Sequence, residues 1–556
     1  MKSLVSINHY FIKYKWRLGL GALFVVLSGL FSIYQGKIVG DATNQIVNLI
    51  ENNTAIDKQL FIQFGLTLLC LALLSGFFMF LMRQTLIVMS RLIEFDQKNE
   101  LYAHYQKLDT TFYKNNSTGD LMNRISEDVG KVRMYTGPAI MYIINTTSTV
   151  IIALFFMFQI NWQLTLLVFA PLPILVFVMY KVSDLINKRS TIVQQELSKL
   201  TSHAQETFSA IRVIKAYARE KHYSNELDAL NTNYKKQSLK LSLVEACFHP
   251  VMILMIGLSV IATVWFGGKL AIDGIVKPGD ITAFITFVYK LTWPFASLGW
   301  VISLVQRASA SQTRINEFLK TESNIVNQST LKKDIVGDIE FKDVSFTYHD
   351  SGIQVLSHFN LSIKKGETLG IKGQIGTGKS TIANLITRLY DVTEGGLLID
   401  QTDIKLHNLD TIRASIGYVP QEVFLFSDTI KNNISFSSNR SYTDDEIIQA
   451  SKDAGVYENI MGFPLGFDTV IGERGITLSG GQKQRISIAR AIISKPQILI
   501  FDDCLSALDV ETEELILTNL KSIMQHKTTI IISHRDSALR YVDSVLELTA
   551  IKNGNL

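Results

Sequence analysis

Long apolar runs dominate the first 305 residues of this 556-residue chain, whereas the rest alternates short apolar and polar segments. Six of the runs are long enough to cross a bilayer as helices, at residues 18–39, 60–82, 138–158, 163–180, 250–272 and 281–305. The residues QINW (159–162) alone separate the third run from the fourth, so these two helices share a short turn on one side of the membrane. The pattern predicts six membrane-spanning helices followed by a water-soluble domain.

Two long polar segments, residues 83–137 and 181–249, connect the spans on the opposite side. Both are rich in Lys and Arg, so the positive-inside rule predicts that they and both chain termini face the cytoplasm. Their composition favours helices, which indicates that the spans continue into the cytosol as arms of about 25 residues, roughly 40 Å long. The arm tips, at residues 113–129 and 206–220, combine turn residues with apolar and charged ones, a combination suited to docking onto another domain.

Composition narrows the class of protein further. The formal net charge of +4 is too small to indicate a strongly basic surface for nucleic acid, so no nucleic-acid partner is expected. The three cysteines are scattered without metal-ligand spacing, and we expect them to be reduced packing residues. The basic start before residue 18 imitates a secretory signal, but no convincing small-residue cleavage site follows, so the first run is expected to remain as a helix.

Lys290, in FVYKLTWPF, places a charge inside the last predicted span. Charged residues in membrane helices are costly, and many are functional and face a water-filled cavity. The alternative is a structural lysine that reaches toward the interface or packs against a neighbouring carbonyl oxygen. The sequence leaves both interpretations open. Pro294 is expected to kink the same helix because it lacks a backbone donor.

The soluble half follows a polar linker, residues 321–336, and contains the segment ETLGIKGQIGTGKSTIANLI. An apolar strand here leads into a glycine-rich loop and then into a helical pattern, which is the context that a phosphate-binding loop requires. The amides of such a loop surround phosphates, its lysine reaches the outer phosphates, and its hydroxyl residue holds Mg²⁺. The predicted nucleotide-binding residues of the loop are Gly373, Gln374, Ile375, Gly376, Thr377, Gly378, Lys379, Ser380 and Thr381.

A second motif, ILIFDDCLSALD at residues 498–509, ends an apolar strand on two adjacent carboxylates. Desolvating a carboxylate is expensive, so such a pair marks a metal, a phosphate or a proton-transfer site. In a P-loop enzyme the strand ends on the carboxylate associated with Mg²⁺, which is Asp502 here. The next position orients or deprotonates the attacking water, and Asp503 occupies it.

The segment between these two motifs carries a resemblance to a known family. LSGGQ, residues 478–482, followed by a basic helix resembles the signature of ATP-binding cassette (ABC) transporters, and six spans before one nucleotide-binding domain resemble their half-size exporters. Further family features occur in order along the chain. They are Tyr348 where the adenine-stacking aromatic belongs, the Gly373–Thr381 loop, Gln421 in YVPQEVFLF, ERG at 473–475, the SALD turn at 506–509 and His534 in IIISHR.

The resemblance implies a fold and a division of the chain. The fold is an α-helical six-span membrane domain with long cytoplasmic helical extensions, followed by an α/β P-loop ATPase domain with a small antiparallel β subdomain and a helical subdomain. The implied boundaries are residues 1–320 for the transmembrane domain, 321–336 for the linker and 337–556 for the nucleotide-binding cassette. The two arm tips resemble the coupling helices of the family.

The implied site binds ATP and Mg²⁺. The resemblance associates the metal with Ser380, Gln421 and Asp502, catalysis with Asp503, His534 and Gln421, and the adenine with Tyr348. Because two cassettes of the family stack head to tail, the signature residues Ser479, Gly480, Gly481 and Gln482 are implied to contact a nucleotide on the P-loop of the opposite subunit. The expected unit is a dimer that ATP closes and hydrolysis resets.

Asp503 departs from the family pattern, in which a glutamate is usual. Aspartate is shorter by one carbon–carbon bond, about 1.5 Å, and misplacing a catalytic group by about 1 Å can cost on the order of a hundredfold in rate. We therefore expect this chain's site to bind ATP and to hydrolyse it slowly. Heterodimeric exporters of the family commonly pair such a half, with its signature intact, with a partner holding the glutamate. A heterodimer with a second half-transporter is thus favoured over a homodimer, although His534 and Gln421 leave some hydrolysis open.

The expected function is ATP-driven export of amphipathic or lipophilic compounds, of the multidrug type, across a bacterial-type cytoplasmic membrane whose lipids surround the spans. A lipid flippase or a peptide exporter is the alternative among transporters, and an ATP-gated channel or regulatory subunit is the alternative from another class. The six spans exclude a soluble cassette ATPase that acts on DNA or ribosomes. The short sequence after His534 indicates a minimal cassette without the extra tail helix of many relatives.

Overall fold

The computed structural model describes residues 2–52, 58–327, 333–374, 376–437, 440–472, 478–504 and 510–549. The chain divides into two compact units. The helical unit comprises Met1–His104 and Gly119–Lys320, and the carboxyl-terminal unit comprises Tyr105–Thr118 and Thr321–Leu556. A short piece of the first long polar segment, residues 105–118, thus belongs to the second unit, because its contacts are made there.

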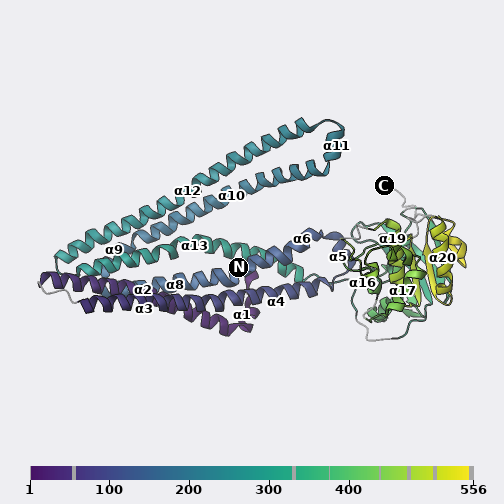
Figure 1. Ribbon diagram of the computed structural model, residues 1–556, viewed down its shortest axis with the longest axis horizontal. Helices are drawn as coiled ribbons and strands as arrows, with labels where there is room; N and C mark the ends of the chain where they lie inside the picture. The colour runs from purple at the N-terminus through teal and green to yellow at the C-terminus, as the bar shows by residue number, and fades with distance from the viewer. Residues whose placement is uncertain are drawn as a thin grey trace. The chain divides into compact units, whose positions relative to one another are not determined.

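The helical unit contains no strand among its described residues and is built from long helices (Figure 1). Three of its turns, η2, η3 and η4, are π-helical, and η1 is a 3₁₀ turn. The elements are η1 (Lys2–Ile7), α1 (Asn8–Lys13), α2 (Lys15–Glu51), α3 (Lys58–Met82), η2 (Arg83–Ile87), α4 (Val88–Tyr105), α6 (Thr118–Asn123), η3 (Arg124–Asp128), α7 (Val129–Met134), η4 (Tyr135–Ala139), α8 (Ile140–Ile160), α9 (Trp162–Phe169), α10 (Pro171–Ser209), α11 (Ile211–Ala216), α12 (Glu220–Ile272) and α13 (Pro278–Leu319).

Five helices of the described chain are long and apolar enough to cross a membrane, by length and composition. They cover Lys15–Glu51, Lys58–Tyr105, Thr118–Ile160, Glu220–Ile272 and Pro278–Leu319. The predicted fourth span, residues 163–180, covers most of α9 and the start of α10. Ala170 between them keeps helical dihedrals, with φ of −54° and ψ of −39°, and its N–H donates to the carbonyl oxygen of Leu166 at 3.0 Å. The predicted turn in QINW is present as Asn161, whose side chain caps α9 by accepting from the N–H of Leu164 at 2.9 Å.

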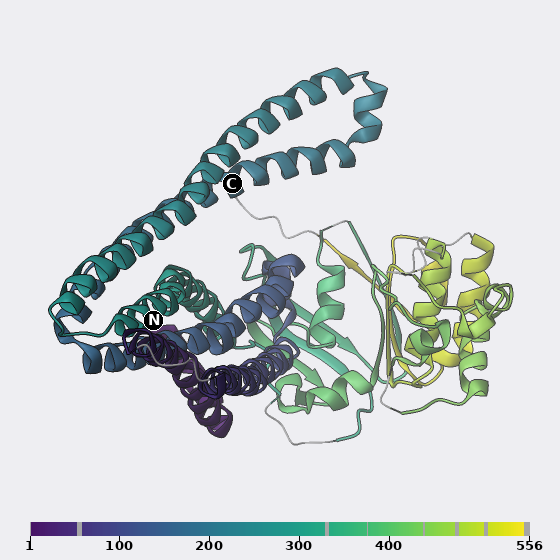
Figure 2. The ribbon, with the colours of Figure 1, turned by 60° about the vertical axis from the view of Figure 1, so that its left-hand side comes forward.

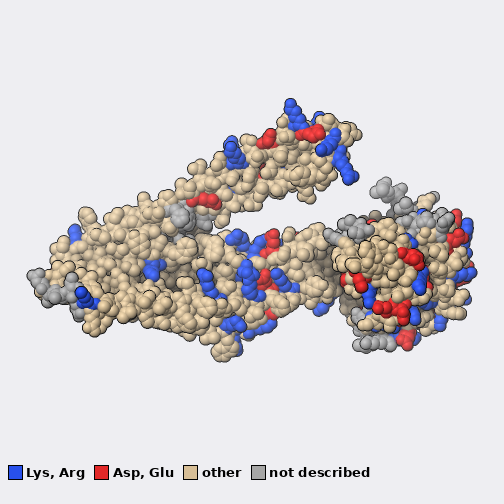
Figure 3. All heavy atoms as spheres, in the orientation of Figure 1, with Lys and Arg blue, Asp and Glu red and all other residues tan. Residues whose placement is uncertain are grey.

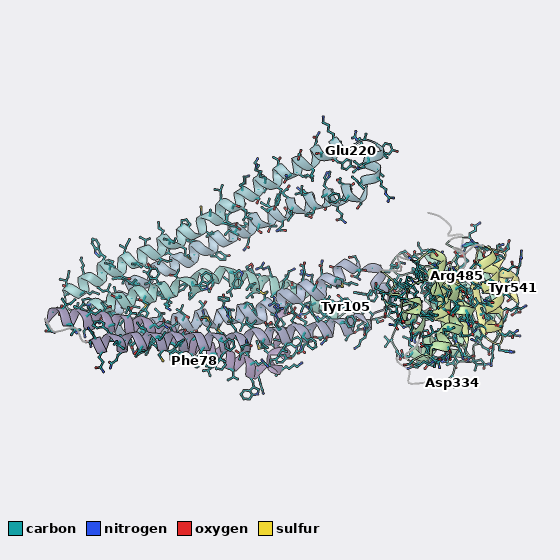
Figure 4. The ribbon with its side chains drawn as sticks, viewed as in Figure 1. Phe78, Tyr105, Glu220, Asp334, Arg485 and Tyr541 are labelled. Carbon is teal, nitrogen blue, oxygen red and sulfur yellow. The ribbon has the colours of Figure 1, made fainter. Side chains whose placement is uncertain are left out.

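Close helix packing holds α2 against α13 and α3. A Cβ atom added to Gly279 would lie 2.1 Å from the carbonyl oxygen of Gly40, so only glycine allows α13 to approach α2 this closely. At the same end of the pair, the side chain of Asn44 accepts from the N–H of Gly279 at 2.8 Å. Phe78 of α3 (Figure 4) contacts Phe24 and Phe31 of α2, with ring centroids 5.9 and 5.6 Å apart. Dense apolar packing of this kind stabilises helix pairs in lipid, where the hydrophobic effect contributes little.

Helices α10 and α12 run side by side and are joined at their tip by α11 (Figures 1 and 2). Glu220, which begins α12, marks this tip in Figure 4, and Tyr105 marks the end of α4. Charged side chains gather around α11 and around α1 and α4, whereas the surface over α2, α3 and α8 is mostly uncharged (Figure 3). Both predicted arms are therefore continuous with apolar helices, as their composition indicated.

The carboxyl-terminal unit contains two sheets. A four-stranded antiparallel sheet has the order β2-β1-β4-β5, and a five-stranded parallel sheet has the order β6-β7-β8-β3-β9. The elements are α5 (Thr110–Asn115), β1 (Ile339–Thr347), β2 (Gln354–Ile363), β3 (Thr368–Gly373), α14 (Lys379–Ile386), β4 (Glu394–Ile399), β5 (Thr402–Asp403), η5 (Ile404–Leu406), α15 (Leu409–Ala414), β6 (Ile416–Val419), α16 (Ile430–Ser435), α17 (Asp444–Asp453), α18 (Tyr457–Met461), η6 (Gly466–Asp468), α19 (Gly480–Ile492), β7 (Ile498–Asp502), α20 (Val510–Met524), β8 (Thr528–Ile532), η8 (Ala538–Tyr541) and β9 (Ser544–Leu548).

The parallel sheet places the functional loops at one edge. Every residue of β7 and of β8 is buried, as continuous apolar strands of parallel sheets require. Fully burying each Ile or Leu side chain contributes roughly 1.5–3 kcal/mol, so Ile498, Leu499 and Ile500, all 0% exposed, fix β7 at the centre of the core. Loops that follow the carboxyl ends of parallel strands meet at the same edge of the sheet. The fold expected from the sequence, a helical region followed by an α/β domain with an antiparallel sheet, is confirmed.

Candidate functional site

The glycine-rich loop joins β3 to α14 at this edge of the sheet. Gly378, the N-cap of α14, has a φ of 91°, and a Cβ atom there would lie 2.3 Å from Cγ1 of Val355. The loop therefore requires glycine both for its left-handed backbone and for its close approach to Val355. The Nζ of Lys379 donates to the carbonyl oxygens of Gly373 and Gln374, each at 2.8 Å. Burial lowers the pKa of Lys379, so an anion in the loop would stabilise its charged form.

Asp502 ends β7 and lies next to the same loop. Its side chain is buried, and the Oγ of Ser380 donates to its Oδ1 at 3.0 Å although the two residues are 122 positions apart. Burial raises the pKa of Asp502, an effect that the hydrogen bond from Ser380 opposes. A hydroxyl and a carboxylate oxygen side by side are ligands that Mg²⁺ prefers, so these residues fit the metal that the sequence implied.

The loop and Asp502 form part of one open cleft with an empty volume of about 690 Å³. The cleft brings together most predicted nucleotide and catalytic residues from widely separated motifs. Its lining consists of Tyr348, Val355, Gly376, Gly378, Lys379, Ser380, Thr381, Gln421, Asp502, Asp503, Ile532 and His534. Of the remaining loop residues, Thr377 is buried and its Oγ1 donates to the carbonyl of Gln374 at 2.9 Å. The predicted residue Ile375, the ERG segment and the SALD turn lie outside the described residues.

Asp503 follows Asp502 in a left-handed backbone conformation with φ of 44°. Its N–H donates to the carbonyl oxygen of Ile532 at 2.9 Å, which fixes this turn against β8. Aspartate adopts positive φ more readily than most residues. Asp503 and His534 both line the cleft, and a carboxylate and an imidazole are groups that can accept or orient a proton of water.

Tyr348 lies in an aromatic cluster at the rim of the cleft. Its ring centroid is 4.8 Å from that of Phe346 and 5.4 Å from that of Tyr390, and its OH is 3.0 Å from Oγ1 of Thr381, which follows the loop. The hydrogen bond links the predicted adenine-stacking residue directly to α14. The position of the Tyr348 ring is therefore coupled to that of α14 through this hydrogen bond.

Sequence reasoning missed Lys114, which lies in α5 within the same compact unit. Its Nζ is 4.7 Å from the centroid of the Tyr348 ring and 2.6 Å from Oδ2 of Asp350. The hydrogen bond from Lys114 lowers the pKa of Asp350, and the hydrogen bond to Asp350 raises the pKa of Lys114. The sequence places Lys114 in an arm tip that is predicted to dock onto another domain. No pattern in the sequence, however, predicts a contact between residue 114 and residue 348.

Further contacts anchor this tip on the rest of its unit. Asp109 caps α5 by accepting from the N–H of Phe112 at 3.1 Å, and its other oxygen accepts from the N–H of Asn324 at 2.6 Å. The Oγ1 of Thr110 donates to the carbonyl oxygen of Leu389 at 3.0 Å. Of the predicted tip, residues 113–118 belong to this unit, and residues from 119 onward belong to the helical unit.

The signature segment lies elsewhere in the same unit. Ser479 caps α19 in a reciprocal arrangement, in which its Oγ accepts from the N–H of Gln482 at 3.3 Å and its N–H donates to Oε1 of Gln482 at 2.9 Å. Arg485 (Figure 4) holds the helix by donating to the carbonyl oxygen of Gly455 at 2.7 Å. Ser479 and Gly480 are exposed, and Gly481 and Gln482 are half-buried. None of these four residues lines the described cleft, so the structure does not bring the signature to this chain's own P-loop.

The fold and the cleft define a P-loop nucleotide-binding domain that follows an apolar helical region. The family pattern of the ABC transporter transmembrane region matches residues 18–295, and that of the ABC transporter ATPase domain matches residues 356–506. The chain belongs to the ABC transporter family, and the resemblance drawn from its motifs is confirmed. It is a multi-pass membrane protein whose ATPase domain binds and hydrolyses ATP to drive transport, with Mg²⁺ as the usual partner of the nucleotide.

Curated relatives extend over most of the chain. The multidrug resistance-like ATP-binding protein MdlA of Escherichia coli is 32% identical over 98% of this chain and 92% of its own length. An ABC transporter ATP-binding protein of Bacillus subtilis, YknU, is 36% identical over 81% of this chain and 77% of its own length. The ATP-dependent lipid A-core flippase of Syntrophus aciditrophicus is 34% identical over 82% of this chain and 75% of its own length. The predicted class, ATP-driven exporters of the multidrug and lipid type, is confirmed.

Proposed function

We propose that this chain is one half of a dimeric exporter that moves amphipathic or lipophilic compounds across the cytoplasmic membrane by alternating access. In this proposal six spans cross the membrane, with α9 and the start of α10 as the fourth, and both termini and the ATPase domain face the cytoplasm. The names of the multidrug resistance-like and lipid A-core relatives support substrates with large apolar parts. A lipid flippase is the second candidate, favoured by the same flippase relatives.

The assignment of site residues is part of the proposal. Lys379 and the loop amides hold the phosphates, Ser380, Gln421 and Asp502 hold Mg²⁺, and Tyr348 stacks on the adenine. The bound metal supplies neutralisation of phosphate charge. His534 and Gln421 orient the attacking water, and Asp503 is a weak general base because its side chain is short. The position of Asp503 in an otherwise complete cleft is the single observation that carries the proposal.

A dimer follows from the placement of the signature. Because Ser479, Gly480 and Gly481 lie outside this chain's cleft, they are available to a nucleotide on a second subunit. A hydroxyl and free amides at the start of a helix form a favourable contact for phosphate. A related partner that carries glutamate at the position of Asp503 would then have a complete site, served by the signature of this chain. We propose this heterodimer ahead of a homodimer.

Substitution of Asp503 tests the slow site in the complex purified from its native host. Asp503→Glu should raise ATPase activity, because it returns the carboxylate toward the attacking water. Asp503→Asn should leave most activity, because the partner site performs most turnovers. Asp453→Asn, which removes a charge at the end of α17, is the matched control and should change nothing.

The composition of the purified complex provides the second readout. A second related half-transporter carrying glutamate is expected to copurify with this chain. A self-pair of this chain, or near-complete loss of ATPase activity in Asp503→Asn, would refute the slow-site heterodimer. ATP-dependent accumulation of an amphiphile in inside-out vesicles supports a pump, whereas passive flux opened by non-hydrolysable ATP supports a channel.

A further inference from the structure

The charges within the predicted spans are all of one sign. Residues 18–39, 60–82, 138–158, 163–180, 250–272 and 281–305 contain no Asp and no Glu. They contain three lysines, Lys37, Lys269 and Lys290. Each of these ammonium groups must find water, a hydrogen-bond acceptor or a counterion that the spans themselves do not supply as carboxylate.

Two of the lysines lie close to the end of a span. Lys37 precedes the end of its predicted span by two residues, and Lys269 precedes the end of its span by three. A lysine side chain can extend along the helix and place its ammonium in the interface from such positions. The Nζ of Lys37 also lies 5.9 Å from the ring centroid of Tyr34 and 5.8 Å from that of Phe156, contacts that partly compensate the charge.

Lys290 is much deeper. It lies nine residues from the start of its span at residue 281 and fifteen from the end at residue 305. At about 1.5 Å of rise per residue, its Cα is about 14 Å from the nearer end, close to the middle of a hydrocarbon core of about 30 Å. Polar groups lie just before that nearer end, where the side chain of Asn44 donates to Asp280 at 3.3 Å and accepts from Gly279.

Ser32 of α2 is the hydrogen-bond partner of Lys290 among the described residues. The Nζ of Lys290 donates to the Oγ of Ser32 at 2.8 Å, and the lysine is half-buried. An ammonium has three donors, so a single neutral hydroxyl leaves the charge without a counterion. The position is fixed by the close packing of α2 on α13, in which a Cβ on Gly36 would lie 2.9 Å from the ring of Phe287.

An exposed aromatic face of α13 adjoins this ammonium. Tyr289, Trp293 and Trp300 are 61%, 62% and 42% exposed, and their spacing of four and seven residues places them on one face of the helix. Lys290 is next to Tyr289 in sequence and one helical turn from Trp293. The protein thus presents a cation and an adjacent apolar surface to whatever lies beside α13 at mid-membrane depth.

We propose that Lys290 and Ser32 bind the anionic head group of an exported amphiphile, whose apolar part lies along the Tyr289–Trp293 face. The inference rests on the proposed export function and names the substrate class, amphiphiles that carry a carboxylate or phosphate. A charge-assisted hydrogen bond is strong where water is scarce, and a buried charge without a counterion disfavours neutral and cationic head groups. A second copy of this chain cannot supply the counterion, because its spans contain the same acid-free sequence.

Three probes with the same oleoyl chain test the proposal in the native complex reconstituted in phosphatidylcholine vesicles. Oleoyl lysophosphatidic acid and oleate are anionic, and mono-oleoylglycerol is neutral. We expect Lys290→Gln to raise the half-saturating concentration of the anionic probes at least about tenfold, the effect of losing a charged hydrogen bond. Mono-oleoylglycerol should be unchanged, and Lys290→Arg should retain anion transport. Lys269→Gln is the matched control and should affect none of the probes.

The pattern across probes also separates the two sources of the anion. A defect confined to lysophosphatidic acid indicates a phosphate lipid head group, and a defect with both anions indicates any anionic amphiphile. Unchanged anion transport in Lys290→Gln, or an equal loss for all three probes, overturns the inference. Loss of the partner subunit from the Lys290→Gln complex also overturns it, because the lysine would then pair with a carboxylate of that subunit.

Failure of this inference can be told from failure of the proposed function. If the wild-type complex exports mono-oleoylglycerol but neither binds nor exports the anionic probes, only the head-group assignment fails. Binding is followed by the fluorescence of the tryptophans, two of which lie on the α13 face. If ATP drives the export of no amphiphile and non-hydrolysable ATP opens a passive flux, the exporter function itself fails.

Discussion

The nucleotide cleft and the start of α19 use their polar groups in opposite ways. In the cleft, Lys379 and Asp502 are buried, and each bonds to other groups of the same unit. At the start of α19, Ser479 and Gly480 are exposed, and Ser479 bonds to its own helix through Gln482. The polar groups of the cleft are thus buried and paired with one another, whereas the start of α19 is a capped helix end that is exposed.

Under the proposed function, one chain would hold two unlike halves of an ATP site. The cleft would supply the charge, the metal ligands and the base, and its described lining contains no residue of α19. The first N–H groups of any helix lack partners within the helix, so α19 retains donors for an external anion. Variants that act on one half and not the other can break or sharpen this comparison.

The largest effect is expected from Lys379→Ala. Removing a buried cation from a phosphate site costs on the order of a hundredfold in affinity, so the nucleotide dissociation constant of this chain's site should rise about that much. Equilibrium binding of a fluorescent ATP analogue to the purified complex measures this dissociation constant. The wild-type complex should show two binding phases, one for each site, and the variant should lose one of them. Lys372→Ala removes an exposed lysine that pairs with Asp536 and should leave both phases unchanged. Retention of both phases in Lys379→Ala would remove this residue from the site.

A smaller and differently distributed effect is expected from Ser479→Ala. ATP affinity at this chain's P-loop should change less than about twofold, whereas ATPase activity of the complex should fall about tenfold, the effect of one lost hydrogen bond to a charged group. The change also removes a helix cap, which costs about 1 kcal/mol of stability. Thr443→Ala removes the matching capping arrangement of α17 and controls for that loss. Equal ATPase losses in the two variants would reduce Ser479 to a structural role.

The smallest effect is expected from Lys114→Ala, which removes a cation from the face of Tyr348. A cation–π contact contributes about 0.5–1 kcal/mol at an exposed site, so ATP affinity should fall about two- to fivefold. Lys98→Ala, which removes an ion pair with Glu94 on α4, is the control. The effect should be the same from pH 6 to about pH 9. The pKa of Asp350 is lowered, so the pair is lost only as pH falls through that value, below about 4. The pKa of Lys114 is raised, so the pair is otherwise lost only as pH rises above about 10.

The grouping of residues in the cleft could be predicted because those residues lie in local sequence patterns that place them at one edge of the sheet. A strand that enters GQIGTGKS and a strand that ends on Asp502 must each place those residues at the carboxyl edge of a parallel sheet. The hydrogen bond from Ser380 to Asp502, across 122 positions, follows from that geometry. The alternation of apolar and polar segments likewise predicted a helical region before an α/β domain.

Features that depend on non-local packing could not be predicted from the sequence. Lys114 contacts Tyr348 because α5 packs within the carboxyl-terminal unit, and the hydrophobic pattern of the sequence does not predict that packing. The left-handed backbone at Asp503 depends on its hydrogen bond to Ile532 of a neighbouring strand.

The separation of the capped end of α19 from the cleft has a genetic consequence under the proposed dimer. Lys379→Ala and Ser479→Ala, placed in the same gene, would damage two different ATP sites, so a double mutant should be worse than either single mutant. The signature defect would act in trans, and its phenotype would match a P-loop defect in the gene of the partner. Comparison of mutant phenotypes in the two genes could therefore show which subunit's P-loop binds the hydrolysed ATP before any complex is purified.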